Sequence, residues 1–262
     1  MKRTILLLIP VMAAMGLVSC FDDLACIRGD GATDTERRRV SAFDQVENST
    51  PFDVVFTKAD TSGISVTADG NLIDNIVTET HGSTLEIKTA PRDACFNYTQ
   101  RPVIQISSPG IKGIAVSGSG NFVADHAEGG AVTIKLSGSG DITVQNVICT
   151  GLAVMLSGSG SITVNDAGCA DSDIFISGSG NIAVSGESDK SNLKISGSGN
   201  IHAGDFQTGS SSVIISGSGD AYAYVQNLLT GMISGSGNIY LKGDPHIDVT
   251  VSGSGRVISN NK

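Results

Sequence analysis

The chain has 262 residues and a formal net charge of −9, with 17 basic and 26 acidic residues. Such an acidic surface argues against nucleic acid and anionic lipid as partners, because both are negatively charged. Tryptophan is absent and aromatic residues make up only 5% of the chain. This scarcity argues against a sugar-stacking cleft.

The N-terminus has the pattern of a bacterial export signal. The basic pair Lys2-Arg3 precedes an apolar run over residues 4–18, which is too short for a comfortable membrane span. The run ends in Leu17-Val18-Ser19-Cys20, which resembles a lipobox, where signal peptidase II cleaves before a cysteine that carries a lipid. We therefore expect residues 1–19 to be a lipoprotein signal peptide and Cys20 to be lipidated. An ordinary secretory signal with a chance cysteine is the alternative.

Residues 20–36 are polar and acidic, and we expect them to form a lipidated N-terminus and tether. No second apolar run follows, so the lipid would anchor the mature chain to a membrane without the chain spanning it. These features predict an outer-membrane lipoprotein of a Gram-negative bacterium, which faces either the periplasm or the cell surface.

Residues 37–110 contain short alternating segments that predict strands without a regular repeat. The strands are expected at 52–56, 64–67, 84–88 and 103–106. Asn71 precedes apolar residues with helical spacing, which predicts a short helix or turn over 71–76. We expect this region to form irregular coils at the start of a single solenoid domain that spans residues 37–262.

The rest of the chain contains the tetrapeptide Ser-Gly-Ser-Gly eight times, at steps of 18 to 20 residues. The copies end at Gly120, Gly140, Gly160, Gly180, Gly199, Gly219, Gly237 and Gly255. A fixed period of this length is typical of stacked repeats. Alternate residues around each copy are apolar, as in Val132, Ile134 and Leu136, and a period of two predicts β-strands. The pattern predicts an all-β fold, a parallel β-solenoid (β-helix) with coils of about 20 residues that is regular over 111–262.

The sequence poses two structural questions, one about the paired glycines of each coil and one about the last segment of the chain. Two glycines face inward at the same place in each coil, which is explained if the opposite wall comes close or if the strand bends sharply. The last segment, residues 256–262, is expected to shield the final coil, whose open edge would otherwise pair with another chain.

The outward residues of the repeats predict polar ladders along the solenoid. Their hydroxyl and amide side chains would recur about 4.8 Å apart, the spacing of neighbouring strands. They form the candidate binding ladder for an unknown glycan or protein ligand. Its members are Ser117, Ser119, Asn121, Ser137, Ser139, Asp141, Ser177, Ser179, Asn181, Ser196, Ser198 and Asn200.

Besides Cys20, four cysteines are candidates for disulfides in an oxidising compartment. Cys149 and Cys169 each follow a Ser-Gly-Ser-Gly by nine residues, so we expect them in register on adjacent coils. They could form a disulfide, or they could be two small buried residues repeated by duplication. Cys26 and Cys95 could tie the tether to the first coils. None of the spacings resembles a zinc site.

The sequence contains no strong catalytic or cofactor motif, and we expect no metal and no cofactor. Gly-Ser-Gly-Asn is not followed by the Gly-Lys-Ser/Thr of a phosphate-binding loop. The histidines are out of phase, since His126 lies six residues after Gly120 and His202 lies three after Gly199. Parallel β-helices include enzymes that cleave polysaccharides, which need clustered carboxylates. The candidates for such a cluster are Asp125, Asp166, Asp171, Asp173 and Asp205.

An ordered set of motifs resembles the bacterial head GIN domain family, described as auto-transporter adhesins and common as lipoproteins in Bacteroides-like bacteria. The motifs are Phe43-Asp44-Gln45-Val46, Phe52-Asp53-Val54, Gly70-Asn71-Leu72-Ile73, Leu85-Glu86-Ile87, the segment 104–114 and the repeated Ser-Gly-Ser-Gly-Asn/Asp-Ile. The resemblance covers roughly residues 37–257. It implies a right-handed parallel β-solenoid and brings no catalytic residue. The shortened coils at 220–233 and 238–251 depart from the family pattern.

The favoured function is a non-catalytic lipoprotein of the cell envelope that acts as an adhesin or surface-binding protein. One alternative is a structural protein of the envelope that binds its own kind through a coil end or edge. The other is a carbohydrate-active enzyme on the same fold. The sequence does not specify the oligomeric state or the ligand.

Overall fold

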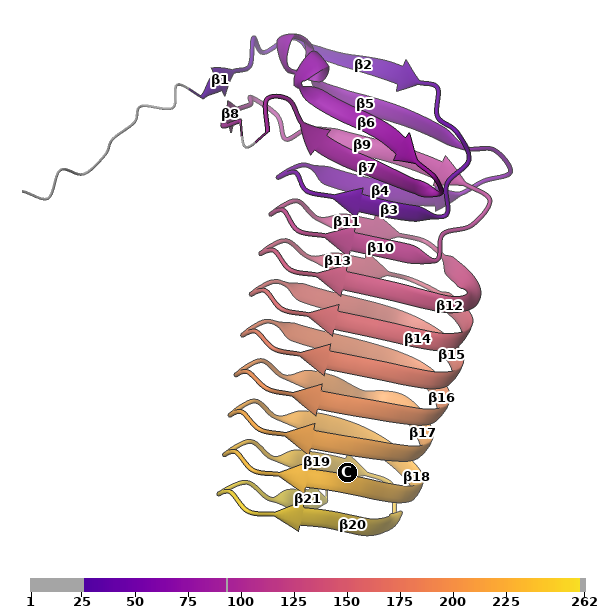
Figure 1. Cartoon of the computed structure of the whole chain (residues 1–262), viewed down its shortest axis with the longest axis vertical. Helices are drawn as coiled ribbons and strands as arrows, with labels where there is room; N and C mark the ends of the chain where they lie inside the picture. The colour runs from indigo at the N-terminus through magenta and orange to yellow at the C-terminus, as the bar shows by residue number, and fades with distance from the viewer. Residues whose placement is uncertain (1–25, 93, 260–262) are drawn as a thin grey trace, which may run out of the picture.

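The computed structural model describes residues 26–92 and 94–259, which form a rod of stacked β-coils with a cap at its N-terminal end (Figure 1). Within these residues no helix is long and apolar enough to cross a bilayer. The predicted signal peptide and the lipidation site at Cys20 lie outside the described residues.

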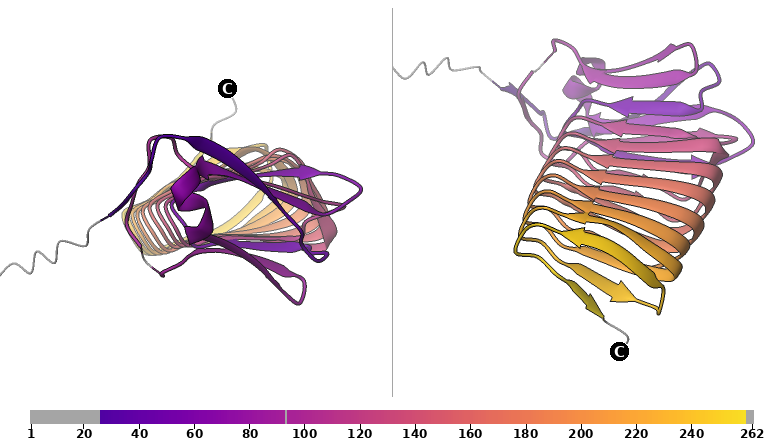
Figure 2. Two further views of the ribbon diagram at one scale, coloured as in Figure 1. Left: turned by 90° about the horizontal axis from the view of Figure 1, so that it is seen from above. Right: turned by 60° about the horizontal axis from the view of Figure 1, so that its bottom comes forward.

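Each regular coil has two flat faces joined by a narrow edge and a wide bend (Figure 2). The first face is the strand before Ser-Gly-Ser-Gly, the narrow edge is the tetrapeptide itself, and the second face is the strand after it. Strands of the first face are β10 (Gly113–Val116), β12 (Ala127–Leu136), β14 (Val147–Leu156) and β20 (His246–Val251). Strands of the second face are β11 (Phe122–Ala124), β13 (Ile142–Val144), β19 (Ile239–Lys242) and β21 (Val257–Ser259). Four strands run from the second face through the bend to the first: β15 (Ser161–Ile176), β16 (Asn181–Ile195), β17 (Ile201–Ile215) and β18 (Ala221–Ile233).

Neighbouring coils pair in parallel and in register, as the repeat predicts. Ile134 on β12 lies opposite Val154 on β14, which lies opposite Ile174 on β15. All three side chains are buried, whereas the residues that alternate with them along each strand face outward. The prediction of an all-β solenoid with a parallel stack is therefore confirmed.

The glycines of the narrow edge lie where the chain bends from one face to the other, and the neighbouring coil leaves no room there for a side chain. A Cβ atom built on Gly158 would lie 1.8 Å from the carbonyl oxygen of Gly138 in the preceding coil. Its backbone does not adopt the left-handed conformation that favours glycine. Of the two explanations drawn from the sequence, the bend is present at the tetrapeptide, whereas the close approach comes from the preceding coil along the stacking axis and not from the opposite wall.

The region expected to form irregular coils over 37–110 is in part a different structure. β3 (Gln45–Asn48) and β7 (Thr84–Thr89) continue the first face in parallel, and β4 (Asp53–Lys58) and β9 (Val103–Ser108) continue the second. Three further strands pair antiparallel: β2 (Thr33–Arg38), β5 (Gly63–Asp69) and β6 (Ile76–His81). With a 3-10 helix at Gly70–Asn75, they form the cap.

The cap covers the apolar end of the rod. Leu72 and Ile73 of the 3-10 helix are buried, and Arg38 donates a hydrogen bond of 3.0 Å from Nη2 to the carbonyl oxygen of Ile73. The outermost strand, β2, is exposed and carries charged residues, which blocks pairing at this edge.

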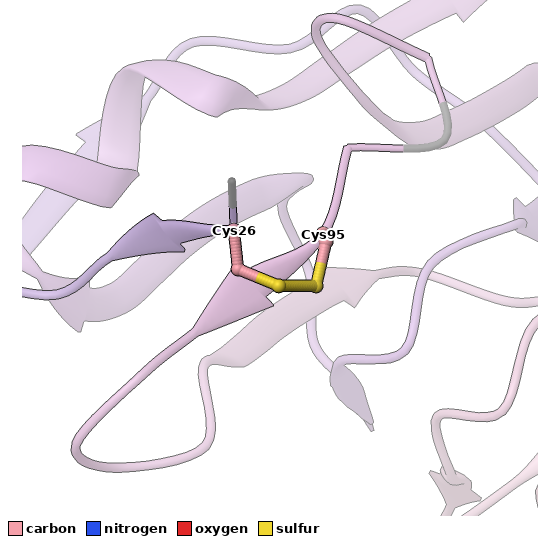
Figure 3. The surroundings of a disulfide bond; sticks show 2 residues. All are labelled: Cys26 and Cys95. Atoms are coloured by element: carbon pink, nitrogen blue, oxygen red, sulfur yellow. A yellow bond between two sulfur atoms is a disulfide. The ribbon is translucent and has the colours of Figure 1, made fainter. Parts of the chain in front are cut away.

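A disulfide joins Cys26 and Cys95 beside the cap, with 4.5 Å between the Cα atoms (Figure 3). The two cysteines precede a short parallel pair, β1 (Ile27–Arg28) and β8 (Phe96–Asn97). The ring of Phe96 packs edge-on against Phe52, with the centroids 5.4 Å apart. The disulfide therefore fixes the start of the described chain to the cap end of the rod.

The C-terminal end of the rod is open. The expected shield at 256–262 is absent from the described part, where Val257–Ser259 form β21 as the last strand of the final coil. Ile247 and Val251 on β20 remain 48% and 45% exposed, although they lie opposite the buried Leu229 and Ile233 of the preceding coil. Residues 257–259 complete the last coil instead of folding over it, and residues 260–262 of the predicted shield lie outside the described residues.

Candidate functional site

The Asn and Asp members of the candidate binding ladder hold one coil to the next. The Oδ1 atom of Asn121 accepts the backbone N–H of Asp141 at 3.1 Å, and Oδ1 of Asp141 accepts that of Ser161 at 2.8 Å. The same bond joins Asn181 to Asn200 and Asn200 to Asp220. These side chains therefore satisfy backbone donors along the narrow edge, a structural role that leaves little of them for a ligand.

The serine hydroxyls divide into two rows. In the first row, Oγ of Ser196 lies 3.3 Å from the carbonyl oxygen of Ile176. The second row consists of the second serine of each Ser-Gly-Ser-Gly, and these serines are exposed. In the described part of the chain their hydroxyls make no hydrogen bond. Its predicted members are Ser119, Ser139, Ser179 and Ser198. This row is the part of the ladder that is free to bind.

Replacing Asn200 by alanine is expected to lower the free energy of unfolding by about 1–2 kcal/mol, because the half-buried N–H of Asp220 loses its acceptor. Ser198→Ala is the matched control on the same coil, and we expect a change within about 0.5 kcal/mol. Urea unfolding followed by circular dichroism measures both. Equal losses would show that the amide has no special structural role.

A groove of about 480 Å³ lies on the first face beside the narrow edge. Ala115 forms its low point, because this small side chain stands between Glu47 on β3 and Lys135 on β12 in the register. Met155 and Phe175 extend the groove along the rod, and Met155 is 40% exposed. The ladder residues Ser117 and Ser137, with Ser157, border it.

The sequence contains a signal for this groove that the candidate binding ladder does not include. Ala115, Lys135, Met155 and Phe175 all lie two residues before a Ser-Gly-Ser-Gly, at an outward position. An alanine among long side chains indicates a hollow there, and two apolar residues facing outward indicate a contact surface. Of the twelve ladder residues, only Ser117 and Ser137 line the groove.

Glu79, His81 and Glu86 have ligand atoms within 4.8 Å of one another near one end of this face. The ammonium of Lys88 donates to Glu79 and Glu86 at 2.8 Å each, and these bonds raise the pKa of Lys88 and lower that of Glu79. The lysine thus supplies the positive charge that a metal would bring, so the cluster fits an ion pair better than a cation site.

The structure does not bring the five candidate carboxylates into one site. Asp125 accepts the N–H of Lys58, and Asp173 accepts the Nδ2 of Asn192 at 2.8 Å. Asp205 lies 3.5 Å from Lys242. None of the five belongs to the one metal-type cluster found among the described residues. The enzyme hypothesis therefore stays an alternative without a carboxylate site assigned to it.

A family model described as "Putative auto-transporter adhesin, head GIN domain" matches residues 42–245. The chain belongs to this family. A crystal structure described as "Putative lipid binding protein from Parabacteroides distasonis" is 29% identical with a TM-score of 0.84, and the match covers 90% of this chain and 99% of that one. A second one from Parabacteroides distasonis, described as "putative adhesin", is 25% identical with a TM-score of 0.81 and covers 89% of this chain and 99% of that one. A comparison with curated proteins found no match.

Two free thiols lie side by side in the head GIN solenoid. Ile148 pairs with Gly168 and Gly151 with Asp171, so Cys149 and Cys169 occupy matching positions on adjacent coils. Both are partly buried against the core. The adjacent strands permit the disulfide, which stays a prediction.

A hydrogen bond between the two thiols shifts their pKa values in opposite directions. The bond from Cys149, assisted by the Ser188 hydroxyl, lowers the pKa of Cys169 to about 7 against the effect of burial. The hydrogen bond with Cys169 and burial raise the pKa of Cys149 well above the usual thiol range. Loss of a second proton would place two negative charges side by side.

We expect iodoacetamide to alkylate Cys169 before Cys149, with a rate that rises with pH around 7. In Cys149→Ala, the pKa of Cys169 should return upward, and its alkylation at pH 7 should be about threefold slower, because the gain in nucleophilicity offsets part of the lost thiolate. Mass spectrometry of the reduced chain from residue 21 measures both rates. Equal labelling of the two thiols would contradict the assignment.

Proposed function

We propose that this protein is a non-catalytic lipoprotein of the outer membrane, anchored through Cys20, which binds a glycan or protein ligand in the groove at Ala115. The lipobox supports the anchor, and the family description supports adhesion. The observation that carries the binding site is the groove itself, where Met155 and Phe175 supply apolar contact and serine hydroxyls border it. Such a combination of an apolar wall and a few polar groups is typical of ligand sites.

The disulfide sets the orientation of the rod in this proposal. Cys26 is fixed to the cap end, six residues after Cys20, and an extended chain of that length reaches roughly 20 Å. The cap end then stays near the membrane and the open end points away. The groove, which borders β3 and β7 of the first face close to the cap, lies in the membrane-proximal part of the rod (Figure 1).

The binding test uses the chain from residue 21, which contains every described residue. Glycan arrays, whole cells and fatty-acid vesicles are compared, the last because a relative is described as lipid binding. Ala115→Arg fills the groove and should abolish binding, whereas Ala153→Arg, on the same face outside the groove, should not. Absence of binding at high micromolar concentration, or equal loss in both variants, would refute the site.

The anchor has its own test. Labelling of cells with a radioactive fatty acid should mark the wild-type chain and leave Cys20→Ala unmarked. Unprocessed precursor should accumulate in the variant. Release of the wild-type chain in soluble form would refute the anchor without bearing on the groove.

A second candidate function, self-association, is favoured by the open C-terminal end. Since the cap covers the other end, two rods would pair β20 with β20, and an antiparallel register centred on Val249 brings Ile247 opposite Val251. Light scattering of the chain from residue 21 should show a dimer that Val249→Lys disrupts. A monomer at high concentration would refute it.

A further inference from the structure

Three aromatic rings form a column on the second face, far from the groove. His202 on β17, Tyr222 on β18 and Tyr240 on β19 lie opposite one another in the register. The ring centroids are 4.9 and 4.7 Å apart, with interplanar angles of 17° and 11°. The chain has only four tyrosines, and Tyr224 also lies on β18, so three of them lie within two neighbouring coils.

One end of this column is open. His202 lies opposite Ala183 on the preceding coil, and a methyl group does not cover an imidazole ring. A hollow of about 350 Å³ adjoins this free ring face. Its polar lining comes from Thr163, Asn165, Ser185 and Asp205. The hollow exists because an alanine interrupts a column of larger outward side chains.

A β-bulge shapes the rim of the hollow. Gly204, Asp205 and Phe206 on β17 have no partners on β18, because Ala203 and Gln207 pair with the consecutive residues Ala223 and Tyr224. Phe206 is fully buried, whereas the Asp205 side chain is 86% exposed. Bulges re-aim side chains in this way and are frequent next to binding sites.

Lys242 holds the bulge from the other side. Its Nζ donates to the carbonyl oxygen of Gly204 at 3.3 Å, lies 3.5 Å from Oδ1 of Asp205 and stands 4.7 Å above the ring of Tyr224. The carboxylate is thus presented at the rim of the hollow by a fixed backbone. Burial and the neighbouring Tyr240 and Asp220 raise the pKa of Tyr222, so its hydroxyl remains a neutral donor.

The geometry points to a second binding site, in which one or two rings of a neutral saccharide stack on His202 and bond to Asp205 and Asn165. A pyranose has a face of C–H groups that packs on an aromatic ring and a rim of hydroxyls that donate to carboxylate and amide oxygens. The volume is near the lower end for small-molecule sites. An anionic sugar would meet Asp205 in a protein of net charge −9.

The test is saturation-transfer NMR on the chain from residue 21, with the methyl glycosides of glucose, galactose, mannose and glucuronic acid as probes. We expect at least one neutral glycoside to bind with a dissociation constant of about 1 mM, corresponding to roughly −4 kcal/mol, and methyl glucuronide to bind more weakly. The strongest transfer should come from the C–H protons of one sugar face.

His202→Ala should weaken this binding about threefold to tenfold, which is the range for an aromatic contact. His246→Ala, an exposed histidine on β20, is the matched control and should bind normally. Ala183→Phe should fill the hollow and abolish binding, with thermal melts to show that each variant is folded. Ala115→Arg should leave glycoside binding intact, which separates this site from the groove. Absence of binding by every neutral glycoside, or normal binding in His202→Ala, would overturn the proposal.

Discussion

Gly158→Ala is expected to lower the free energy of unfolding by about 3 kcal/mol or more, at the upper end of the range for overpacked sites. The new Cβ would meet the carbonyl oxygen of Gly138 at 1.8 Å. That oxygen belongs to the backbone, so no side-chain rotation relieves the clash. The two coils must separate, which weakens the bond from Ser159 N–H to the same oxygen. Thermal unfolding followed by circular dichroism should show a melting temperature about 6–12 °C lower.

Gly151→Ala is the control, since it lies in the same coil and a Cβ there meets nothing within 4 Å. It should leave stability unchanged or raise it slightly, because alanine restricts the unfolded chain. A melt of Gly158→Ala that matches the wild type, or equal losses in the two variants, would refute the stacking explanation. The glycines would then be a product of repeat duplication alone.

The solenoid could be predicted from the sequence because its two determinants are local and repeated. The alternation around Val132, Ile134 and Leu136 gives the strands and their buried side, and the 18- to 20-residue step gives the stacking. The reason for the glycines could not be predicted. It depends on the separation of neighbouring backbones along the axis, which no single coil encodes.

The cap was harder to predict than the coils. The segments that became β5 and β9 alternate in the same way whether they pair in parallel or antiparallel, and here they pair antiparallel. The direction of pairing is set by the need to cover the apolar end of the first coil, where Leu72 and Ile73 are buried. That need arises only once the whole rod is assembled.

Positions within the repeat were compared among the histidines alone, which was too narrow a set of residues. Comparing His126 with His202 correctly predicted that histidines form no column, but His202, Tyr222 and Tyr240 all lie three residues after the last glycine of a copy. The low aromatic content of the chain concealed their clustering. In the ladder, the repeat of Asn121 and Asn200 has a structural reason that the sequence did not show, because each side chain accepts a backbone N–H of the next coil. Ligand binding by the ladder stays a prediction.

The burial of Phe206 links the stability of the rod to the bulge. Its side chain is fully buried and lies opposite Gly186 in the register, a residue with no side chain to fill the space. Phe206→Ala would leave a cavity at the wide bend, and we expect a loss of about 3–5 kcal/mol in the free energy of unfolding. Urea unfolding at constant pH measures the loss.

Phe175→Ala is the matched control, because that ring is half-buried on the outer face, with the Nζ atom of Lys194 5.6 Å from its centroid. It should cost about 1 kcal/mol. If Phe206 anchors the bulge, its replacement should also free Asp205 from its fixed place and weaken glycoside binding in molecules that are still folded, whereas Phe175→Ala should leave that binding unchanged. Equal losses of stability in the two variants would mean that the bulge is held by Lys242 and the backbone alone, and Phe206 would then be one core residue among many.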